Sequence, residues 1–210
     1  MALLLLAGPG LAGPASAEEL RVVALGDSLT HGYGLPPSQS FPAQLETWLA
    51  ARGHEAVEIV NAGVSGDTTA GGRARLDWAL AEGGDALIVE LGGNDLLRGI
   101  DPAVSRENLD AILAEAAARG LPTLLTGLTA PPNYGPEWRA AFDAMFPELA
   151  EAHGALLYRD FLAGVVEDRS LWQADGIHPN AEGVAVIVER IGPSVERLIE
   201  RARAKAPEES

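Results

Sequence analysis

Short apolar runs alternate with amphipathic stretches along most of the chain. Five of these runs are strand-like, because they are brief and rich in valine, isoleucine and leucine; they cover residues 20–26, 55–61, 85–91, 121–128 and 155–158. Apolar residues recur with helical spacing in the segments between and after them, over residues 41–51, 73–81, 102–119, 136–153 and 181–203. Proline near a helix start, as at Pro42, and glycine just past a helix end, as at Gly120, support these boundaries.

This order of elements predicts an α/β fold. Alternating strands and helices are typical of a parallel sheet with helices on both faces and right-handed crossovers. The run 85–91 is almost wholly apolar, as expected for a strand that is covered on both sides. We therefore predict a three-layer α/β/α sandwich around a five-stranded parallel sheet, with one domain spanning residues 18–203 of the 210-residue chain.

The two ends of the chain differ from this domain. Residues 1–17 begin with an apolar run and end in Ala15-Ser16-Ala17, a pattern typical of a signal-peptidase site. The basic residues that usually precede such a run are missing. We therefore expect a signal peptide, complete or truncated, and a periplasmic or secreted protein, with a cytosolic protein as the alternative. The apolar run is too short and too rich in glycine and proline to span a membrane, so no stable anchor is expected in the mature chain. Residues 204–210 are expected to form a frayed tail.

Composition excludes several classes of function. The chain has no cysteine, which excludes a disulfide framework, a thiolate metal site and a cysteine nucleophile. Its formal net charge of −15 is opposite in sign to the charge that a nucleic-acid binder needs, so no nucleic-acid partner is expected. Nothing in the sequence specifies an oligomeric state.

Chemically useful residues follow the predicted strands where the chain leaves the sheet. Ser28 follows the first strand, Gly63 the second and Asn94 the third. The carboxyl ends of parallel strands share one edge of a sheet, and ligands of α/β folds bind there. Asp175 and His178 lie three residues apart in the sequence and can reach the same edge from beyond the fifth strand. We expect these five residues to meet.

Such residue types suit acyl transfer by a serine nucleophile. His178 would take the proton of Ser28 and return it to the leaving group, while Asp175 would hold the imidazole in the correct tautomer. The backbone N–H groups of Ser28 and Gly63 and the side-chain amide of Asn94 would stabilise the oxyanion. Gly63 is expected to let the substrate approach the backbone closely.

Two other functions are compatible with parts of this pattern. A metal-dependent phosphoesterase could use oxygen and imidazole ligands from Asp27, Asp95, Asp175 and His178, although Ser28 would then have no role. A non-catalytic binding module could also keep the fold. Aspartates next to a strand end are as readily turn or helix-cap residues as ligands.

Four sequence blocks, taken together, resemble the SGNH (GDSL) hydrolase superfamily, and most closely its bacterial branch of multifunctional acyl-CoA thioesterases, lysophospholipases and arylesterases. The blocks stand in the family's order at residues 26–30, 61–68, 90–95 and 175–180. This resemblance implies a flavodoxin-like fold and a cofactor-free Ser-His-Asp hydrolase whose substrate is a small acyl or aryl ester.

The resemblance also implies positions that line the substrate pocket. These are Leu96, Leu97, Pro132, Asn133 and Tyr134. Leu96 stands where close relatives often have glycine, and Pro131 replaces an aliphatic residue. A preference for one acyl chain length is therefore not expected to carry over from the family.

Overall fold

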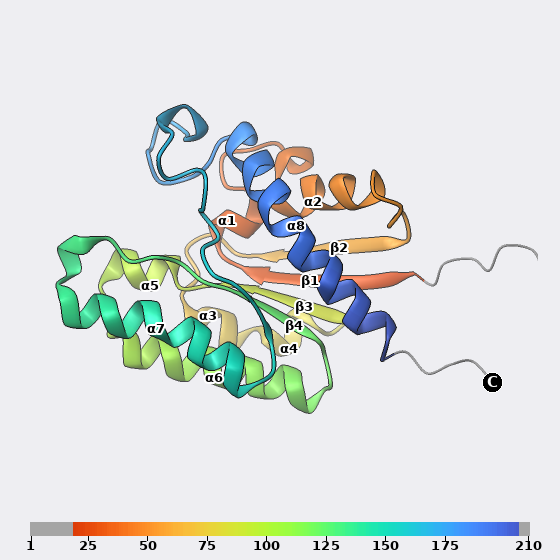
Figure 1. Ribbon diagram of the computed structural model, residues 1–210, viewed down its shortest axis with the longest axis horizontal. Coiled ribbons are helices and arrows are strands. Elements are labelled where there is room, and N and C mark those ends of the chain that lie inside the picture. Colours follow the sequence, from red (N-terminus) through yellow and green to blue (C-terminus); the bar gives the residue numbers. More distant parts are fainter. Residues whose placement is uncertain (1–18, 206–210) are drawn as a thin grey trace, which may run out of the picture.

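The protein is described here by a computed structural model that covers residues 19–205. Its centre is a five-stranded sheet with the strand order β2-β1-β3-β4-β5, in which every neighbouring pair is parallel. The strands are β1 (Leu20–Gly26), β2 (Val57–Gly63), β3 (Ala86–Glu90), β4 (Thr123–Thr126) and β5 (Leu156–Tyr158). All carboxyl ends lie along one edge, on the left in Figure 1. The predicted sheet is confirmed.

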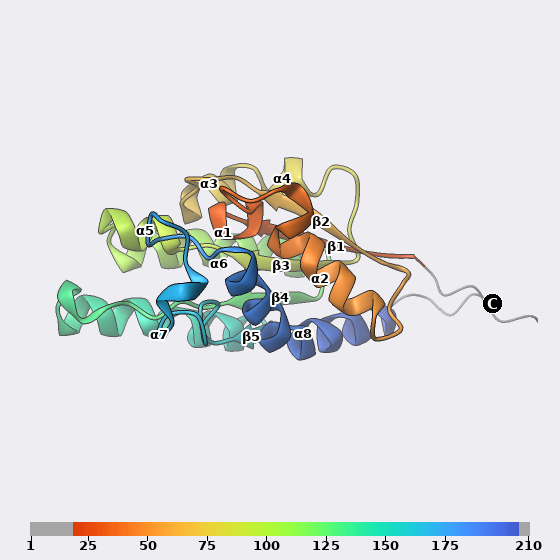
Figure 2. The ribbon, with the colours of Figure 1, turned by 90° about the horizontal axis from the view of Figure 1, so that it is seen from above.

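Helices cover both faces of this sheet (Figures 1 and 2). On one face, α2 (Phe41–Ala50) packs against the long α8 (Ala181–Arg203). The other face carries α3 (Thr69–Ala74), α4 (Leu76–Ala79), α6 (Pro102–Ala118) and α7 (Pro136–Ala152). Two short helices, α1 (Ser28–His31) and α5 (Gly93–Arg98), begin directly at the carboxyl edge. The predicted three-layer sandwich is confirmed as well.

The core follows the apolar pattern of the sequence. Every residue of β3 is buried, as expected for a strand with helices on both sides. Helix α8 buries a stripe with helical spacing that includes Ile187, Ile191, Val195 and Leu198. Each such side chain stabilises the folded state by about 1.5–3 kcal/mol when it is fully buried. The rigid sheet therefore holds its carboxyl edge in a fixed shape.

The structure differs from the prediction near residues 69–81. The expected single helix 73–81 is two helices, α3 and α4, which are interrupted at Arg75. Helix α3 starts earlier because the Thr68 hydroxyl accepts a hydrogen bond from the Gly71 N–H at 3.3 Å. Helices α1 and α5 were too short to leave a periodic signal. The predicted signal peptide, residues 1–17, and residues 206–210 of the predicted tail lie outside the described residues.

Three one-turn 3₁₀ helices complete the described part of the chain, at Pro37–Gln39, Pro132–Tyr134 and Arg169–Leu171. Within residues 19–205, no helix has both the length and the apolar character needed to cross a bilayer.

Candidate active site

Ser28 is the first residue of α1, immediately beyond the carboxyl end of β1. The carboxylate of Asp27 caps this helix by accepting a hydrogen bond from the Leu29 N–H at 2.9 Å. Gly26 is the last residue of the strand, and any larger residue there would collide with the side chain of Thr30. The tight turn from strand to helix therefore presents the Ser28 hydroxyl at the rim of the sheet.

Ser28, His178 and Asp175 form a continuous chain of hydrogen bonds. The Ser28 Oγ lies 2.9 Å from His178 Nε2, and His178 Nδ1 lies 2.7 Å from Asp175 Oδ2. The other carboxylate oxygen of Asp175 accepts hydrogen bonds from the Ile177 and His178 N–H groups. The hydrogen bond from His178, followed by these two backbone bonds, lowers the pKa of Asp175 to about 2, so this group is a carboxylate at neutral pH.

A short hairpin carries His178 to the rim. Trp172 and Pro179 pair as an antiparallel bridge, and the Gln173 N–H donates to the His178 carbonyl at 2.8 Å. The Gln173 side chain also donates to the Tyr33 carbonyl at 2.7 Å, in the loop that follows α1. Gln173 thus joins the His-bearing hairpin to the Ser-bearing turn. Sequence reasoning missed this residue, because a polar side chain in a loop gives no sign of its partner.

Asn94 faces the same rim from α5. Its Nδ2 donates one hydrogen bond to Asp27 Oδ2 at 3.0 Å, and because an amide nitrogen carries two hydrogens, a second N–H remains for another acceptor. Asn94 and Ser28 both line the pocket at this rim. The structure therefore brings four of the five predicted residues, Ser28, Asn94, Asp175 and His178, into one connected group.

Gly63 has a different environment from the predicted one. It ends β2 beside Gly26, and its N–H donates to the Asn61 side-chain oxygen at 3.0 Å. An added Cβ would lie 2.8 Å from the His31 Cα and 2.9 Å from the Asp27 carbonyl oxygen. The missing side chain therefore makes room for the backbone of α1 and for the Asp27 carbonyl. Gly63 is not among the residues that line the pocket.

Two carboxyl groups are buried beneath Ser28. Asp27 is 2% exposed and Glu90, at the end of β3, is 1% exposed. Burial raises the pKa of Asp27 to about 6 and raises that of Glu90 well above its usual value. Sequence reasoning gave Glu90 no role, although a charged residue that ends an otherwise apolar strand is the signal by which it could have been found.

Arg75 connects the ends of β1 and β2 at the carboxyl edge. Its guanidinium donates to the Ala62 carbonyl at 2.7 Å and to the Gly26 carbonyl at 2.8 Å, which are at the ends of β2 and β1. The same group pairs with Asp67 at 2.5 Å. Arg75 leaves the helical pattern between α3 and α4 to make these contacts, which explains the break in the predicted helix.

The geometry does not assemble the ligands of the metal-dependent alternative. Asp95 faces away from the rim and accepts hydrogen bonds from the Thr69 N–H and hydroxyl and from the Ser105 hydroxyl, at 2.6–2.8 Å. It thereby ties α5 to α3 and α6. Across residues 19–205, no three His, Asp or Glu side chains are grouped as metal ligands would be.

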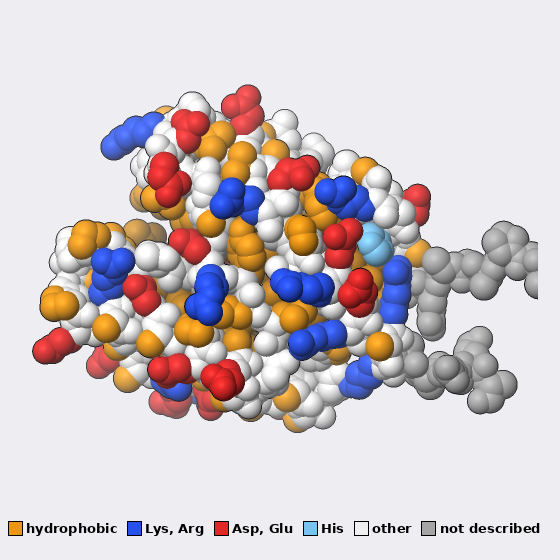
Figure 3. Space-filling model, in the orientation of Figure 1, with side chains coloured by type: hydrophobic (Ala, Val, Ile, Leu, Met, Phe, Trp, Pro, Cys, Tyr) orange, Lys and Arg blue, Asp and Glu red, His pale blue; other side chains and the backbone are white. Residues whose placement is uncertain are grey.

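A pocket of about 650 Å³ opens beside Ser28. Figure 3 shows it as part of a notch in the left edge of the molecule, with hydrophobic side chains on both sides. Of the predicted lining residues, Leu96, Leu97 and Pro132 contribute to its wall. Asn133 and Tyr134 do not line it, and the Tyr134 hydroxyl instead donates to the Leu96 carbonyl at 2.5 Å, behind the wall.

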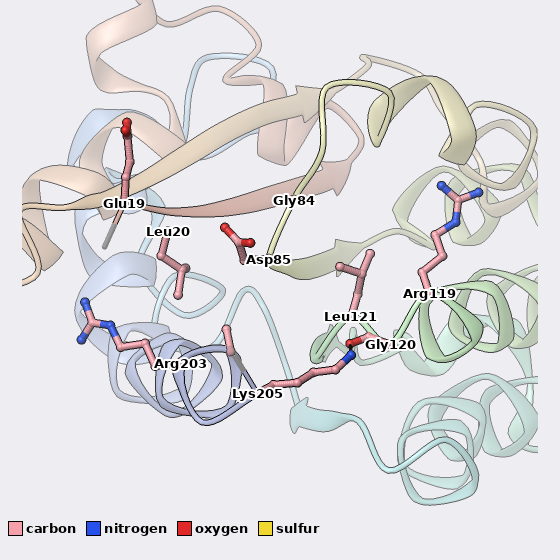
Figure 4. Close-up of a pocket in the computed structure, with 10 residues that line it drawn as sticks. Glu19, Leu20, Gly84, Asp85, Arg119, Gly120, Leu121, Arg203 and Lys205 are labelled. Carbon is pink, nitrogen blue, oxygen red and sulfur yellow. Dashed lines mark hydrogen bonds between the residues drawn. The ribbon is translucent and has the colours of Figure 1, made fainter. Parts of the chain in front are cut away.

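A smaller pocket, of about 270 Å³, lies at the opposite end of the sheet (Figure 4). Charged side chains of both signs surround it, including Asp85, Arg119 and Lys205. Arg119 is paired with Asp77, and Lys205 donates to the Gly120 carbonyl. This pocket joins no nucleophile to a base, and it is at the edge where α/β folds do not bind substrates.

An α/β sandwich with a serine, a histidine and an aspartate hydrogen-bonded in series has the arrangement of a serine hydrolase. Comparison with known proteins agrees with this class. The GDSL-like Lipase/Acylhydrolase family matches residues 24–186, and the chain belongs to this family.

The chain is also similar to individual members of known name. It is 42% identical over 186 residues to Esterase TesA of Pseudomonas aeruginosa, covering 88% of this chain and 91% of that protein. It is 35% identical over 187 residues to Thioesterase 1/protease 1/lysophospholipase L1 of Escherichia coli K12, covering 88% and 86%. A crystal structure of TesA superposes with a TM-score of 0.79 at 40% identity, over 85% of this chain and 99% of that one. The protein is an enzyme that hydrolyses ester bonds.

Proposed function

We propose that this enzyme hydrolyses carboxylic esters through an acyl-enzyme formed on Ser28. The observation that carries the proposal is the unbroken series of hydrogen bonds from Ser28 Oγ through the His178 ring to Asp175, at 2.9 and 2.7 Å. His178 takes the hydroxyl proton as Oγ attacks the carbonyl carbon, and then gives it to the departing alcohol. A water molecule repeats the sequence on the acyl-enzyme and releases the acid.

The oxyanion of the tetrahedral intermediate is stabilised by N–H groups at the rim. The Ser28 N–H is the first of α1 and therefore has no partner within the helix. The second N–H of Asn94 is available beside it. The Gly63 N–H would join them only by exchanging its bond to Asn61 for one to the substrate. Losing one such donor costs an acyl-transfer enzyme about 3–4 kcal/mol of transition-state stabilisation.

The substrate class proposed is an acyl or aryl ester of modest size. The pocket beside Ser28 is walled mainly by apolar side chains, which suits a hydrocarbon chain or an aromatic ring. The names of the similar proteins include esterase, thioesterase and lysophospholipase activities, and a 35% identical protein of Vibrio mimicus is an arylesterase. Thioesters and lysophospholipids are therefore secondary candidates, and neutral carboxylic esters are the first.

The proposed compartment is the periplasm or the exterior of the cell. The support is the apolar segment 1–17 with its small-x-small ending before Glu18. Fractionating the cells and sequencing the amino terminus of the protein in each fraction tests this directly. A mature chain that starts at Glu18 supports export, and an intact leader contradicts it.

Substitution of the nucleophile tests the catalytic proposal. Turnover of p-nitrophenyl esters of increasing chain length is measured for the wild type and for Ser28→Ala. We expect kcat to fall by at least about 10³-fold at every length, because the remaining oxyanion donors and binding alone give little catalysis. A fluorophosphonate probe is expected to label the wild type at Ser28 and to leave the variant unlabelled.

A second serine provides the matched control. Ser65 Oγ lies 3.0 Å from His31 Nδ1 on the exposed surface, so Ser65→Ala removes a similar serine–histidine contact without touching the proposed nucleophile. Its activity is expected to match that of the wild type. Full activity in Ser28→Ala would refute the proposal. Loss of wild-type activity in EDTA would favour the metal-dependent alternative. A wild type that shows neither labelling nor turnover would favour a binding module.

A further inference from the structure

The buried carboxyl pair beneath Ser28 has no part in the mechanism described so far. Asp27 and Glu90 lie at the ends of adjacent strands, where Gly26 pairs with Glu90 in the register of β1 and β3. The Asp27 N–H donates to Glu90 Oε2 at 3.4 Å, and the Thr30 hydroxyl donates to the same oxygen at 2.8 Å. Two acids buried so close together cannot both be ionised without a large electrostatic cost.

The hydrogen-bond donors decide which of the two acids carries the charge. Asp27 accepts one N–H on each oxygen, from Leu29 at 2.9 Å and from Asn94 at 3.0 Å. Glu90 accepts both of its hydrogen bonds on Oε2, while Oε1 is buried without a partner among the described residues. A buried carboxylate with one oxygen lacking any protein donor is unfavourable. The charge therefore belongs on Asp27, and the proton on Glu90.

Asp27 is in direct contact with the amide that faces the substrate. The amide of Asn94 can rotate, and its bond to Asp27 Oδ2 fixes which of its ends points toward the rim. Gly93 allows this approach, because an added Cβ there would lie 3.0 Å from the same oxygen. With one N–H of Asn94 held by Asp27, the other is directed to the pocket as a donor and not as an acceptor.

The surrounding charges are consistent with one negative charge at this place. His178 is the titratable group that favours ionised Asp27 from the side of the hairpin, and Asp27 is the group that opposes ionisation of Glu90. Thr126 on β4, the register partner of Glu90, donates its hydroxyl to Val89 and carries no charge. If Glu90 were ionised as well as Asp27, its charge would add to the repulsion of the oxyanion that forms beside Asn94.

We infer that Glu90 is a neutral, proton-carrying acid that fixes the Asp27 carboxylate, and that Asp27 in turn orients Asn94 as a donor to the oxyanion. Both are positioning residues, and the inference rests on the proposed function because it assigns them to that reaction. Asp27 and Glu90 thereby join the proposed catalytic site, although neither the sequence motifs nor the hydrogen bonds of Ser28 identify them.

A double-mutant cycle tests the link between Asp27 and Asn94. The kcat and KM for p-nitrophenyl butyrate are measured for Asn94→Ala, Asp27→Asn and the double variant. We expect Asn94→Ala to lower kcat by about 10²–10³-fold, and Asp27→Asn to lower it at least about tenfold with KM changed less than about threefold. The double variant is expected to equal Asn94→Ala within about threefold, because Asp27 acts through Asn94. Losses that multiply, or an unchanged or faster kcat in Asp27→Asn, would overturn the inference.

Paired substitutions of Glu90 test its protonation state. Glutamine reproduces the shape and neutrality of a protonated glutamate, whereas leucine removes both polar atoms. We expect kcat of Glu90→Gln to exceed that of Glu90→Leu by at least about tenfold. Equal loss in both variants, with both folded by circular dichroism, would show that the carboxylate itself is needed and would overturn the neutral assignment. If Glu90→Leu does not fold, Glu90→Gln is compared with the wild type, and a loss beyond about tenfold overturns it.

The same measurements separate this inference from the proposed function. Asp110→Asn alters an exposed carboxylate that is bonded to His153 at 2.8 Å, far from the pocket, and is expected to match the wild type. If the wild type shows activity that Ser28→Ala abolishes, the proposed function holds and the cycle judges the positioning residues alone. If Ser28→Ala is as active as the wild type, the proposed function itself fails.

Discussion

The carboxylate of Asp175 contacts the His178 ring and is partly exposed to solvent. The Asp175 side chain is 35% exposed, yet three donors converge on it, from the His178 ring and from the N–H groups of Ile177 and His178. These hydrogen bonds, and not burial, are what lower its pKa to about 2. The group keeps its charge throughout the pH range in which the enzyme would act, and loses it only as the pH falls toward that value.

Replacing this carboxylate by an amide should impair catalysis far more than folding. We expect Asp175→Asn to lower kcat by about 10²–10⁴-fold, because an amide can hold the imidazole in the wrong tautomer and does not stabilise its charged form. The melting temperature should change little. Activity on a short p-nitrophenyl ester and a thermal melt at pH 7 provide the two readings.

Asp110→Asn is again the matched control, since it removes a second carboxylate–histidine contact that has no serine beside it. Its kcat should equal that of the wild type. An Asp175→Asn enzyme with nearly full activity would show that the carboxylate does not assist His178.

At the scale of elements, Arg75 joins the ends of two strands from the break between α3 and α4. It donates to the carbonyls of Gly26 and Ala62, each next to a residue of the candidate site, and pairs with Asp67. The side chains of Arg75 and Asp67 are 15% and 19% exposed, so this pair is largely removed from solvent. This guanidinium therefore joins the backbone hydrogen bonds that fix the turns after β1 and β2.

Loss of this guanidinium should reduce both stability and turnover. We expect Arg75→Met to lower the free energy of unfolding by about 2–4 kcal/mol, somewhat less than the loss for a fully buried pair. Asp67 loses its ion-pair partner and the Ala62 carbonyl loses this donor, while the Gly26 carbonyl keeps the Val64 N–H. The urea midpoint measures the first effect and kcat the second. Arg106→Met, which breaks the exposed pair with Glu148, should cost only about 0–1 kcal/mol. Equal midpoints for the two variants would contradict the role given to Arg75.

A column of aromatic rings supports the wall of the pocket. Tyr134, Trp138, Phe142 and Phe146 follow one another at helical spacing, with successive ring centroids 4.5, 5.1 and 5.4 Å apart. At the outer end of the column the Tyr134 hydroxyl holds the Leu96 carbonyl. The loop before α7 and the end of α5 are thus attached to the core and to each other, although Tyr134 does not face the pocket.

The limits of the sequence are clearest at the loops of the rim. Ser28 and Asn94 could be predicted to meet, because each comes shortly after a parallel strand and the ends of such strands lie on one edge. The Asp175–His178 pair lies on a hairpin well past β5, so the order of the strands showed only that it could reach this edge. The direction of individual side chains could not be predicted. Tyr134 and Gln173, for example, are oriented by hydrogen bonds to residues that are distant in the sequence, and a local sequence pattern gives no information about such partners. Short helices such as α1 contain too few residues to establish a period.

Two further residues show how packing between distant elements escapes a reading of the sequence. Gly63 was predicted to follow a strand over residues 55–61 and instead ends β2, and its small size is needed by the neighbouring α1 backbone. Glu90 ends an apolar strand, and a charged residue there is usually at the surface, whereas this one is 1% exposed. Both depend on packing between elements that are distant in the sequence.

At the scale of the whole molecule, the formal net charge of −15 bears on the choice of substrate. A negatively charged protein repels a polyanionic substrate over a distance that salt controls, about 30 Å at 0.01 M and about 3 Å at 1 M ionic strength. A neutral ester is insensitive to this field. The charge should therefore affect acyl-CoA more than a simple ester with the same acyl chain.

Matched substrates at two salt concentrations test this effect. We expect kcat/KM at about 0.01 M salt to be higher for p-nitrophenyl esters than for acyl-CoA of equal chain length, and we expect the gap to narrow at about 1 M salt because the repulsion is screened. The ester value should stay nearly constant between the two conditions. A preference for acyl-CoA at low salt would reject the proposed order of substrates.

The hydrogen bond between Ser28 and His178 joins residues that are 150 positions apart. During translation, the proposed nucleophile therefore emerges from the ribosome well before its proposed base has been synthesised. Under the proposed mechanism, a partly translated chain would lack the base for its nucleophile, and activity would begin only when almost the whole domain has been made and has folded.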